Sequence, residues 1–192
     1  MVMKTRSTLL WGDINSESAK EFVATSSACA GDSYDPIFVY IHSDGGDVDA
    51  CAAIIDQISL LKKRGIKVVT IGQGKCYSSG AIILAHGSAG HRYATKNTGL
   101  MLHPVSIEEM PPCSIGDASK LMTFCNLLYG RLLDSMYKQC CRPGKIKKKI
   151  FANEVEKTLW MTPEVAITYG LIDSIWNGEI DKYGGETFSN NK

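Results

Sequence analysis

The sequence lacks any apolar stretch near the ~20 residues that a membrane-spanning helix requires, and residues 1–6 lack the apolar stretch of a signal peptide. Its net charge of +1 gives no general attraction to nucleic acid or to a membrane surface. Its seven cysteines are odd in number and contain no C-x-x-C pair, so neither a disulfide framework nor a zinc site is expected. These absences predict a cytoplasmic protein with free thiols and without a metal, another cofactor, a nucleic-acid partner or a membrane.

Strand-like and helical segments alternate along the first half of the chain. Short apolar runs rich in β-branched and aromatic residues predict strands, and apolar residues at helical spacing predict amphipathic helices between them. The expected strands are 7–11, 36–42 and 67–71, and the expected helices are 15–28 and 48–65. Strands and helices in this order predict a right-handed parallel βαβ stack, so the expected fold class is α/β.

One long helix dominates the second half of the chain. Leu121, Phe124 and Leu128 lie on one side of the helix expected at 117–139, and this apolar stripe is broad enough that a partner subunit is expected to cover part of it. The other expected elements are strands 91–94 and 99–103, a basic connector at 142–149, a short helix at 162–170 and a strand at 171–175. A chain of 192 residues predicts a single domain, with a core at about 7–177 and a polar tail at 178–192.

A serine lies where a strand-like run gives way to a helix. Ser78 belongs to the small-residue turn Gly-Lys-Cys-Tyr-Ser-Ser-Gly-Ala at 74–81. The first turn of a helix leaves backbone N–H donors unpaired, so this serine has beside it the donors that a developing oxyanion needs. Gly45-Gly46 lets a second stretch of backbone approach closely, because glycine has no side chain. Together with His103 on a later strand, this pattern predicts nucleophilic acyl transfer at Ser78.

Two neighbouring residues have alternative interpretations. Cys76 lies in the same turn and is the less favoured candidate nucleophile. His42 ends a strand close to the proposed site, and either lines that site or has a structural role.

Four segments, in order along the chain, resemble motifs of one family. They are Val-Tyr-Ile-His-Ser-Asp-Gly-Gly at 39–46, Tyr-Ser-Ser-Gly-Ala at 77–81, Met-Leu-His-Pro at 101–104 and Trp-Met-Thr-Pro-Glu…Tyr-Gly-Leu-Ile-Asp at 160–173. They are similar to the "YINSPGG", "ASMGA", "MIHQP" and "FMSAEEAKEYGLID" motifs of the proteolytic subunit of the Clp (caseinolytic) protease, the ClpP family. The resemblance covers roughly residues 7–177.

The resemblance implies a fold, an activity and an assembly. The fold would be a ClpP/crotonase-like spiral of βαβ units with a protruding long helix. The activity would be that of a serine-type endopeptidase, with Ser78 as nucleophile, His103 as general base, and the backbone N–H groups of Gly46 and Ser79 facing the oxyanion. Such subunits would form a homo-oligomer of two stacked heptameric rings that cleaves polypeptides supplied by an AAA+ unfoldase, which makes the peptidase ATP-dependent.

Besides a shorter segment before the first expected strand, where the family has an axial loop that helps to engage the unfoldase, the sequence departs from the family pattern at two places. The family has an aspartate as third catalytic residue, and the corresponding position holds Thr158, with Glu156 as the alternative. Pro111-Pro112 replaces a glycine-rich substrate-pairing strand and removes two N–H donors there. Two alternative functions therefore stay open: a catalytically weak or inactive ClpP-like assembly subunit, or a crotonase-like acyl-CoA enzyme.

Overall fold

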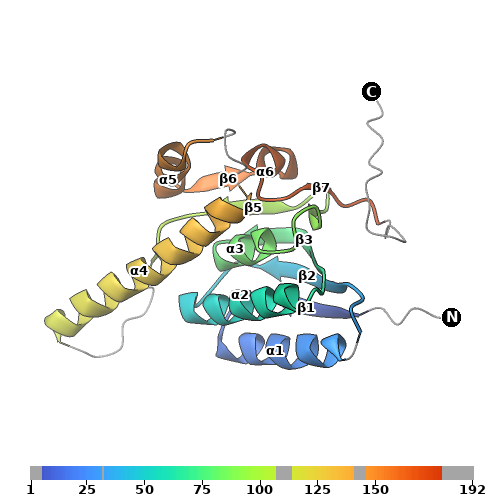
Figure 1. Ribbon diagram of the computed structural model, residues 1–192. Helices are drawn as coiled ribbons and strands as arrows, with labels where there is room; N and C mark the ends of the chain where they lie inside the picture. Colours follow the sequence, from blue (N-terminus) through green and yellow to red (C-terminus); the bar gives the residue numbers. More distant parts are fainter. Residues whose placement is uncertain (1–5, 32, 107–113, 141–145, 179–192) are drawn as a thin grey trace.

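A central β-sheet with helices packed on it organises the chain (Figure 1). The computed structural model describes residues 6–31, 33–106, 114–140 and 146–178. Its strands are β1 Ser7–Trp11, β2 Ile37–Ser43, β3 Val68–Tyr77, β4 Arg92–Ala94, β5 Gly99–Leu102, β6 Leu159–Met161 and β7 Ser174–Ile175. Its helices are α1 Ser16–Ala30, α2 Val48–Lys63, α3 Ser79–Ala85, α4 Ile115–Cys140, α5 Lys148–Glu156 and α6 Pro163–Tyr169.

The sheet is mostly parallel, as the alternation of strands and helices predicts. The strand order is β1-β2-β3-β4-β7, and every pair along this path is parallel. Helices α1, α2 and α3 cover one face, and the larger apolar core lies beneath them. Alternate residues of β2 point to the opposite face, where Phe38, Val69 and Tyr93 form a smaller cluster with Tyr40 and Trp176. The α/β class expected from the sequence is therefore confirmed.

Strand β3 pairs with different strands along its length, and its end positions the candidate site. Its first half pairs with β2 and β4, and its last residues, Lys75–Tyr77, pair with β5. The small-residue pattern predicts a turn at 74–81, but only Ser78 lies outside an element, because β3 extends to Tyr77 and α3 begins at Ser79. Gly72 and Gly74 interrupt the apolar pattern that marks a strand, but backbone pairing with Gly99–Met101 continues the strand to Tyr77.

The long helix α4 extends away from the sheet at its N-terminal end (Figure 1). Its range, Ile115–Cys140, agrees with the expected helix at 117–139. The protruding half exposes large apolar side chains, among them Phe124 and Leu127, each more than half accessible. No element within the described ranges covers them, so this surface is available to a partner.

The C-terminal third contains two elements that the sequence pattern does not predict, α5 and the antiparallel strand β6. The final strand β7 is also shorter than predicted. Leu171 and Ile172 are buried, but they lie in a bend before the strand. The proline-containing segment at Pro111-Pro112 and most of the polar tail lie outside the described residues. Within the described ranges, no helix combines the length and the apolarity needed to cross a membrane.

Candidate active site

Ser78 occupies a strained backbone position between β3 and α3. Its φ of 52° and ψ of −121° place a residue with a side chain in a region that mainly glycine adopts. A backbone hydrogen bond of 2.7 Å from Ser78 N–H to Met101 O ties this position to β5. The side chain remains only partly buried. The local fold thus holds one hydroxyl at the carboxyl end of a parallel strand, at the cost of backbone strain.

The loop that contains Gly45 and Gly46 lies directly against Ser78. A Cβ atom added to Gly45 would lie 2.7 Å from Ser78 Cβ and 3.2 Å from Ser78 Oγ. A Cβ atom on Gly46 would lie 2.1 Å from Ile14 O, so only glycine fits there. Both glycines also have a positive φ, of 110° and 142°. The sequence-based interpretation of this glycine pair as a close backbone approach is therefore confirmed.

Side-chain hydrogen bonds fix this loop to the start of α3. Ser79 Oγ donates to Gly46 O at 3.0 Å, and Ser43 Oγ accepts from Gly45 N–H at 3.0 Å. Among the described residues, Gly46 N–H has no hydrogen-bond acceptor. Ser79 is the first residue of α3, and the N–H of a first helical residue has no intrahelical acceptor. Two N–H donors on adjacent segments are thus left for a ligand oxygen.

His103 lies one residue beyond β5, the strand that pairs with the end of β3. Because Tyr77 pairs with Met101 in a parallel ladder, Ser78 and His103 both follow the carboxyl ends of neighbouring strands. His103 is half-buried, and its carbonyl accepts a hydrogen bond from the Tyr129 hydroxyl of α4. Within the described part of the chain, neither ring nitrogen of His103 has a hydrogen-bond partner, so no hydrogen bond to Ser78 is closed. The topology brings the two side chains to the same edge of the sheet.

Thr158 immediately precedes β6, on the other side of β5 from Ser78. Strands β5 and β6 are antiparallel and their last pair is Leu102 with Leu159, so Thr158 and His103 each lie one residue beyond this pair. Thr158 has a φ of 63°, which is a genuine outlier for a β-branched residue. Its N–H donates to Val155 O at 3.0 Å. The predicted position of the third catalytic residue thus follows the same end of the β5–β6 pair as His103, and it holds a hydroxyl in place of a carboxylate.

Glu156, the alternative third residue, ends α5 two residues earlier and is exposed. Its charge acts on the nearby Tyr129 phenol. Burial raises the pKa of Tyr129 first, and the neighbouring acidic groups of Cys51 and Glu156 raise it further. Both candidates for the third residue thus lie at or just after the end of α5, immediately before β6, the strand that pairs with β5.

Cys76 and His42, two further residues near this site, are held in place by contacts with the sheet. Cys76 is fully buried, its thiol is 3.4 Å from Ile41 O, and burial raises its pKa to about 12, so it is an unreactive thiol. His42 stacks on Trp11 at a centroid distance of 4.5 Å, and its Nδ1 is 2.8 Å from Gln73 O. The prediction that Cys76 is the less suitable nucleophile is supported, and His42 is held by the neighbouring strands.

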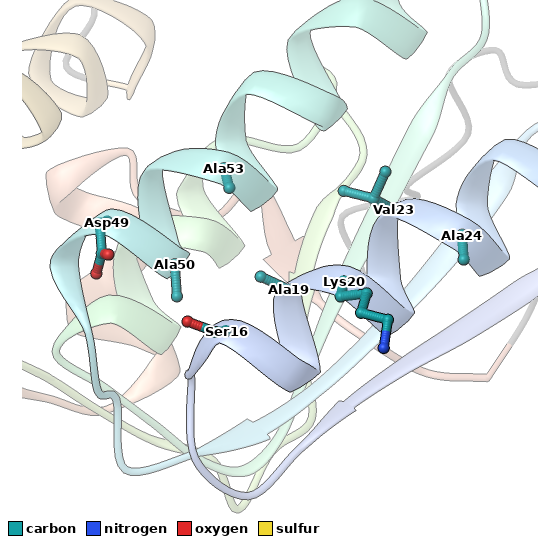
Figure 2. A pocket seen from close by; sticks show the side chains of 8 residues that line it. All are labelled: Ser16, Ala19, Lys20, Val23, Ala24, Asp49, Ala50 and Ala53. Carbon is teal, nitrogen blue, oxygen red and sulfur yellow. The ribbon is translucent and has the colours of Figure 1, made fainter.

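A groove of about 540 Å³ lies elsewhere, between α1 and α2 (Figure 2). Small apolar side chains line it, including Ala19, Ala50 and Ala53, with Lys20 and Asp49 among its polar lining residues. None of the candidate catalytic residues contributes to this groove. Across the described ranges, no group of three or more His, Cys, Asp or Glu side chains is arranged to hold a metal ion.

The parallel sheet, the helices layered on it and the long projecting helix, together with the two matches that follow, assign the molecule to the class of ClpP/crotonase-like α/β spirals. The chain belongs to the Clp protease family, because the Clp protease family model matches residues 1–179. The structure is similar to that of a mutant of ClpP1 from Listeria monocytogenes, with a TM-score of 0.72, 26% sequence identity and coverage of 90% of this chain and 91% of the other. These matches confirm the family resemblance and the spiral fold inferred from the sequence.

Curated relatives agree with this family assignment. The chain is 30% identical over 176 residues to "ATP-dependent Clp protease proteolytic subunit 2" of Pseudomonas aeruginosa, covering 90% of this chain and 82% of the relative. It is 29% identical over 175 residues to the protein of the same name from Treponema denticola, again covering 90% of this chain and 82% of the relative. A peptidase function is thus supported by the family and by the names of the relatives.

Tyr129 contacts the candidate site, although the sequence pattern does not indicate it. The stripe of Leu and Met residues on α4 predicts packing, and Tyr129 lies on the buried side of the same helix. A buried tyrosine hydroxyl needs a hydrogen-bond partner. A tyrosine on the apolar face of a helix therefore indicates that some partner exists, but the sequence does not identify it. The partner, His103 O, is 26 positions away, so periodicity within the helix gives no indication of it.

Proposed function

We propose that this chain is the proteolytic subunit of a serine-type endopeptidase, with Ser78 as nucleophile and His103 as general base. The observation that carries the proposal is the strained backbone of Ser78, held beside the end of β5 and against the Gly45-Gly46 loop. A backbone conformation that costs roughly 1–3 kcal/mol persists where the surrounding structure fixes it, and such positions cluster at active sites.

The proposed reaction uses these groups in two stages. Ser78 Oγ attacks the carbonyl carbon of a peptide bond while His103 takes the hydroxyl proton. The negative oxygen of the tetrahedral intermediate lies against the N–H groups of Gly46 and Ser79. The C–N bond then breaks, His103 returns the proton to the leaving amine, and the acyl group remains as an ester on Ser78. Water, deprotonated by His103, attacks this ester; the C–O bond to Ser78 then breaks, His103 returns the proton to Ser78 Oγ, and the carboxylic acid product leaves.

The third residue determines how fast this reaction can be. We assign the position to Thr158, with Glu156 as the alternative, because Thr158 occupies the place of the family's aspartate and, like His103, lies one residue beyond the last β5–β6 pair. A threonine hydroxyl can accept a hydrogen bond from the ring and fix its orientation. It cannot stabilise the imidazolium as a carboxylate does, and loss of that carboxylate cost ~10⁴ in kcat in a serine protease studied in detail. The proposed peptidase is therefore slow in its unassisted form.

The assembly that we propose for this chain is the one expected from its membership of the Clp protease family. We assign it to a cytoplasmic homo-oligomer of two stacked heptameric rings, formed by single-domain subunits with a core at 7–177. An AAA+ unfoldase would supply polypeptides to it and make proteolysis ATP-dependent. The uncovered apolar side chains Phe124 and Leu127 of α4 support a contact between subunits. The printed names of the relatives, "ATP-dependent Clp protease proteolytic subunit 2", support the dependence on ATP.

One observation favours a second function, that of a ring subunit with little or no catalytic activity. Thr158 replaces the carboxylate, and the ring of His103 has no hydrogen-bond partner among the described residues. The family assignment gives no corresponding support to an acyl-CoA enzyme.

Reaction with a small fluorophosphonate separates the two functions. Purified assembled protein is treated with the reagent, and the adduct is located by peptide mass spectrometry. The serine peptidase predicts one adduct at Ser78 that disappears in Ser78→Ala and slows strongly in His103→Ala. Ser106→Ala, which removes an exposed serine near His103 in the sequence, is the matched control and keeps full labelling. A complete absence of labelling in the assembled wild type would favour the inactive subunit.

A further inference from the structure

The long helix α4 is hydrogen-bonded to the residue that we assign as general base. The hydroxyl of Tyr129 donates to the main-chain carbonyl of His103. Tyr129 is 7% exposed and packs into the main core, so its ring cannot easily move away. The bond therefore joins a rigidly packed side chain of one element to the backbone of another.

The phenol keeps its proton under all ordinary conditions. Burial raises the pKa of Tyr129 above its usual value of 10, and the neighbouring acidic groups of Cys51 and Glu156 raise it further. A protonated phenol is a permanent donor. The tie to His103 thus does not switch off when the histidine takes up or releases a proton.

The carbonyl of His103 needs such a donor because the sheet ends there. Leu102 is the last residue of β5, and Pro104 follows His103 without an N–H group. Among the described residues, the hydroxyl of Tyr129 donates to this carbonyl. A fixed carbonyl fixes the peptide plane after His103, and that plane sets the direction of the bond from Cα to the imidazole.

We propose that the Tyr129 hydroxyl is a positioning residue for catalysis, which orients the imidazole of His103 toward Ser78 through its main-chain carbonyl. This inference rests on the proposed function, since it concerns the same serine and histidine. This hydrogen bond matters more in this chain than it would beside a complete triad. The position of the third catalytic residue, which would orient the imidazole from the β6 side, holds Thr158 and no carboxylate. Tyr129 supplies from α4 part of the constraint that a conventional third residue supplies from the β6 side.

Helix α4 also contacts the element that follows the serine. His86, at the C-terminal end of α3, lies with Nδ1 2.7 Å from Ile82 O and Nε2 3.1 Å from Ser135 Oγ of α4. Lys62 of α2 donates to Gln139 Oε1 of α4 at 2.9 Å. Helix α4 thus contacts both the segment after Ser78 and the segment that carries His103. The position of the Tyr129 hydroxyl is therefore fixed relative to both segments.

The test compares two tyrosines of the same helix. Tyr137 also donates from its hydroxyl to a main-chain carbonyl, that of Ile146 at 2.7 Å, but Ile146 has no catalytic role. Tyr129→Phe and Tyr137→Phe each remove one oxygen atom and one hydrogen bond from α4. The measured quantity is the limiting first-order rate constant of labelling by the fluorophosphonate, which reports on the reactivity of correctly folded subunits and not on their number.

We expect Tyr129→Phe to lower this rate constant by about tenfold or more, since small displacements of a catalytic group cost up to ~10²-fold. The concentration of reagent at half-maximal rate stays unchanged. Tyr137→Phe stays within about twofold of the wild type, even if both variants lose similar thermal stability. Equal rate constants for the two variants would overturn the proposal. If the wild type itself is not labelled at Ser78, the proposed function fails and this inference fails with it.

A second pair of variants covers the case in which Tyr129→Phe does not fold. Replacement of Tyr129 by 4-methylphenylalanine fills the space of the hydroxyl without a donor, and replacement by 4-aminophenylalanine restores a donor. The proposal requires slow labelling in the methyl variant and a rate close to that of the wild type in the amino variant. Equal rates in this pair would overturn it, because packing alone would then explain the role of Tyr129.

Discussion

Thr158 is the residue at which a single substitution should increase activity. An aspartate there would place a carboxylate beside His103, and Asp tolerates a φ of 63° better than a β-branched residue does. We expect Thr158→Asp to raise the rate constant of fluorophosphonate labelling and of peptide hydrolysis by at least about tenfold, because a carboxylate stabilises the imidazolium.

Thr158→Asn is the matched control, since it also relieves the backbone strain but carries no charge. If the Asn and Asp variants react at the same rate, relief of strain and not charge is responsible. Glu156→Gln then tests the alternative third residue. A marked loss of rate in Glu156→Gln, with no gain in Thr158→Asp, would move the role to Glu156.

His86 makes the stability of the fold sensitive to acid. Burial lowers the pKa of His86 below its ordinary value of 6.5, the bond to Ile82 O opposes this, and the charges of Lys62 and Arg92 lower it further. The unfolded chain therefore binds more protons than the folded chain as the pH falls below about 6.5, so the free energy of unfolding decreases there. One such group changes it by no more than about 1.4 kcal/mol per pH unit.

Urea unfolding at about pH 7.5 and about pH 5.5 measures this dependence. We expect His86→Gln to lose less stability over this interval than the wild type does, whatever its stability at the higher pH. Some dependence remains, because burial also lowers the pKa of His91. The same loss of stability in both proteins would show that His86 is not the group responsible.

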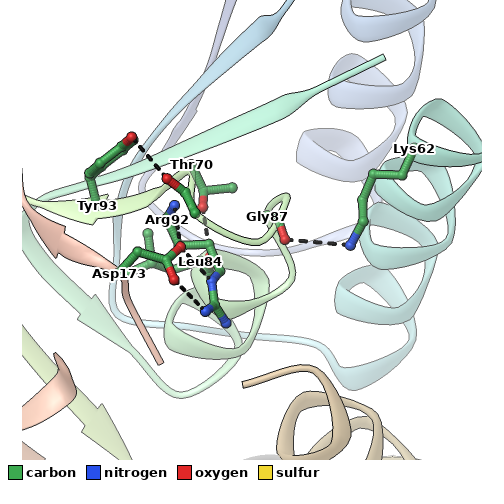
Figure 3. Close-up of polar contacts among 8 residues, drawn as sticks. Lys62, Thr70, Leu84, Gly87, Arg92, Tyr93 and Asp173 are labelled. Atoms are coloured by element: carbon green, nitrogen blue, oxygen red, sulfur yellow. Dashed lines mark hydrogen bonds and ion pairs between the residues drawn. The ribbon is translucent and has the colours of Figure 1, made fainter. Parts of the chain in front are cut away.

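At the scale of elements, one ion pair joins the C-terminal segment to the sheet (Figure 3). Arg92 of β4 donates from Nε and Nη2 to the carboxylate of Asp173 at 2.9 and 2.7 Å, and its backbone N–H donates to the same group at 3.0 Å. The Arg92 side chain is 6% exposed and that of Asp173 is 18% exposed. The pair holds the turn between α6 and β7 against β4.

Removal of one partner should cost more than removal of both. Asp173→Ala leaves a buried guanidinium without its carboxylate, and we expect a loss of about 3 kcal/mol or more in the free energy of unfolding. The double variant Arg92→Met with Asp173→Ala avoids the unpaired charge, so it should lose less, as measured by urea unfolding. A double variant less stable than Asp173→Ala would contradict this account.

Elements with strong local patterns can be predicted from the sequence, and those that depend on pairing partners cannot. Helices α2 and α4 and the first strands have the apolar periodicity expected of them. Strand β6 has only three residues and pairs with β5, so its sequence contains too little pattern to indicate a strand. Helix α5 begins in a lysine-rich segment, where charge obscures the buried positions Phe151 and Val155.

The same distinction applies to the candidate site. Ser78 and the Gly45-Gly46 loop can be identified from the sequence alone. Glycine at a strand end allows a backbone conformation that other residues rarely adopt, and a serine at the start of a helix lies beside unpaired N–H groups. The bonds from Tyr129 to His103 and from His86 to Ser135 span 26 and 49 positions. They depend on how α4 packs across the other helices, and the order of residues along the chain does not specify that packing.

At the scale of the whole molecule, helix α4 links the interior of the subunit to its surroundings. Its C-terminal half contacts the segments that carry Ser78 and His103 through partly buried hydrogen bonds. Its N-terminal half projects beyond the other helices and exposes apolar side chains (Figure 1). Helix α4 therefore connects any contact made by its projecting half to the candidate active site through one continuous helix.

The projecting half of α4 provides the test of assembly. Phe124 is 54% exposed and Leu127 is 52% exposed, and large apolar side chains gathered on one helix mark a contact between proteins. We expect Phe124→Asp with Leu127→Asp to halve the particle mass measured by sedimentation, because charges in an apolar contact would separate the two rings of the proposed assembly. Asn126→Asp, an exposed neighbour that gains a charge of the same sign, keeps the wild-type mass. If all three proteins sediment alike, α4 does not join the rings, and its apolar side chains must be covered by a different partner.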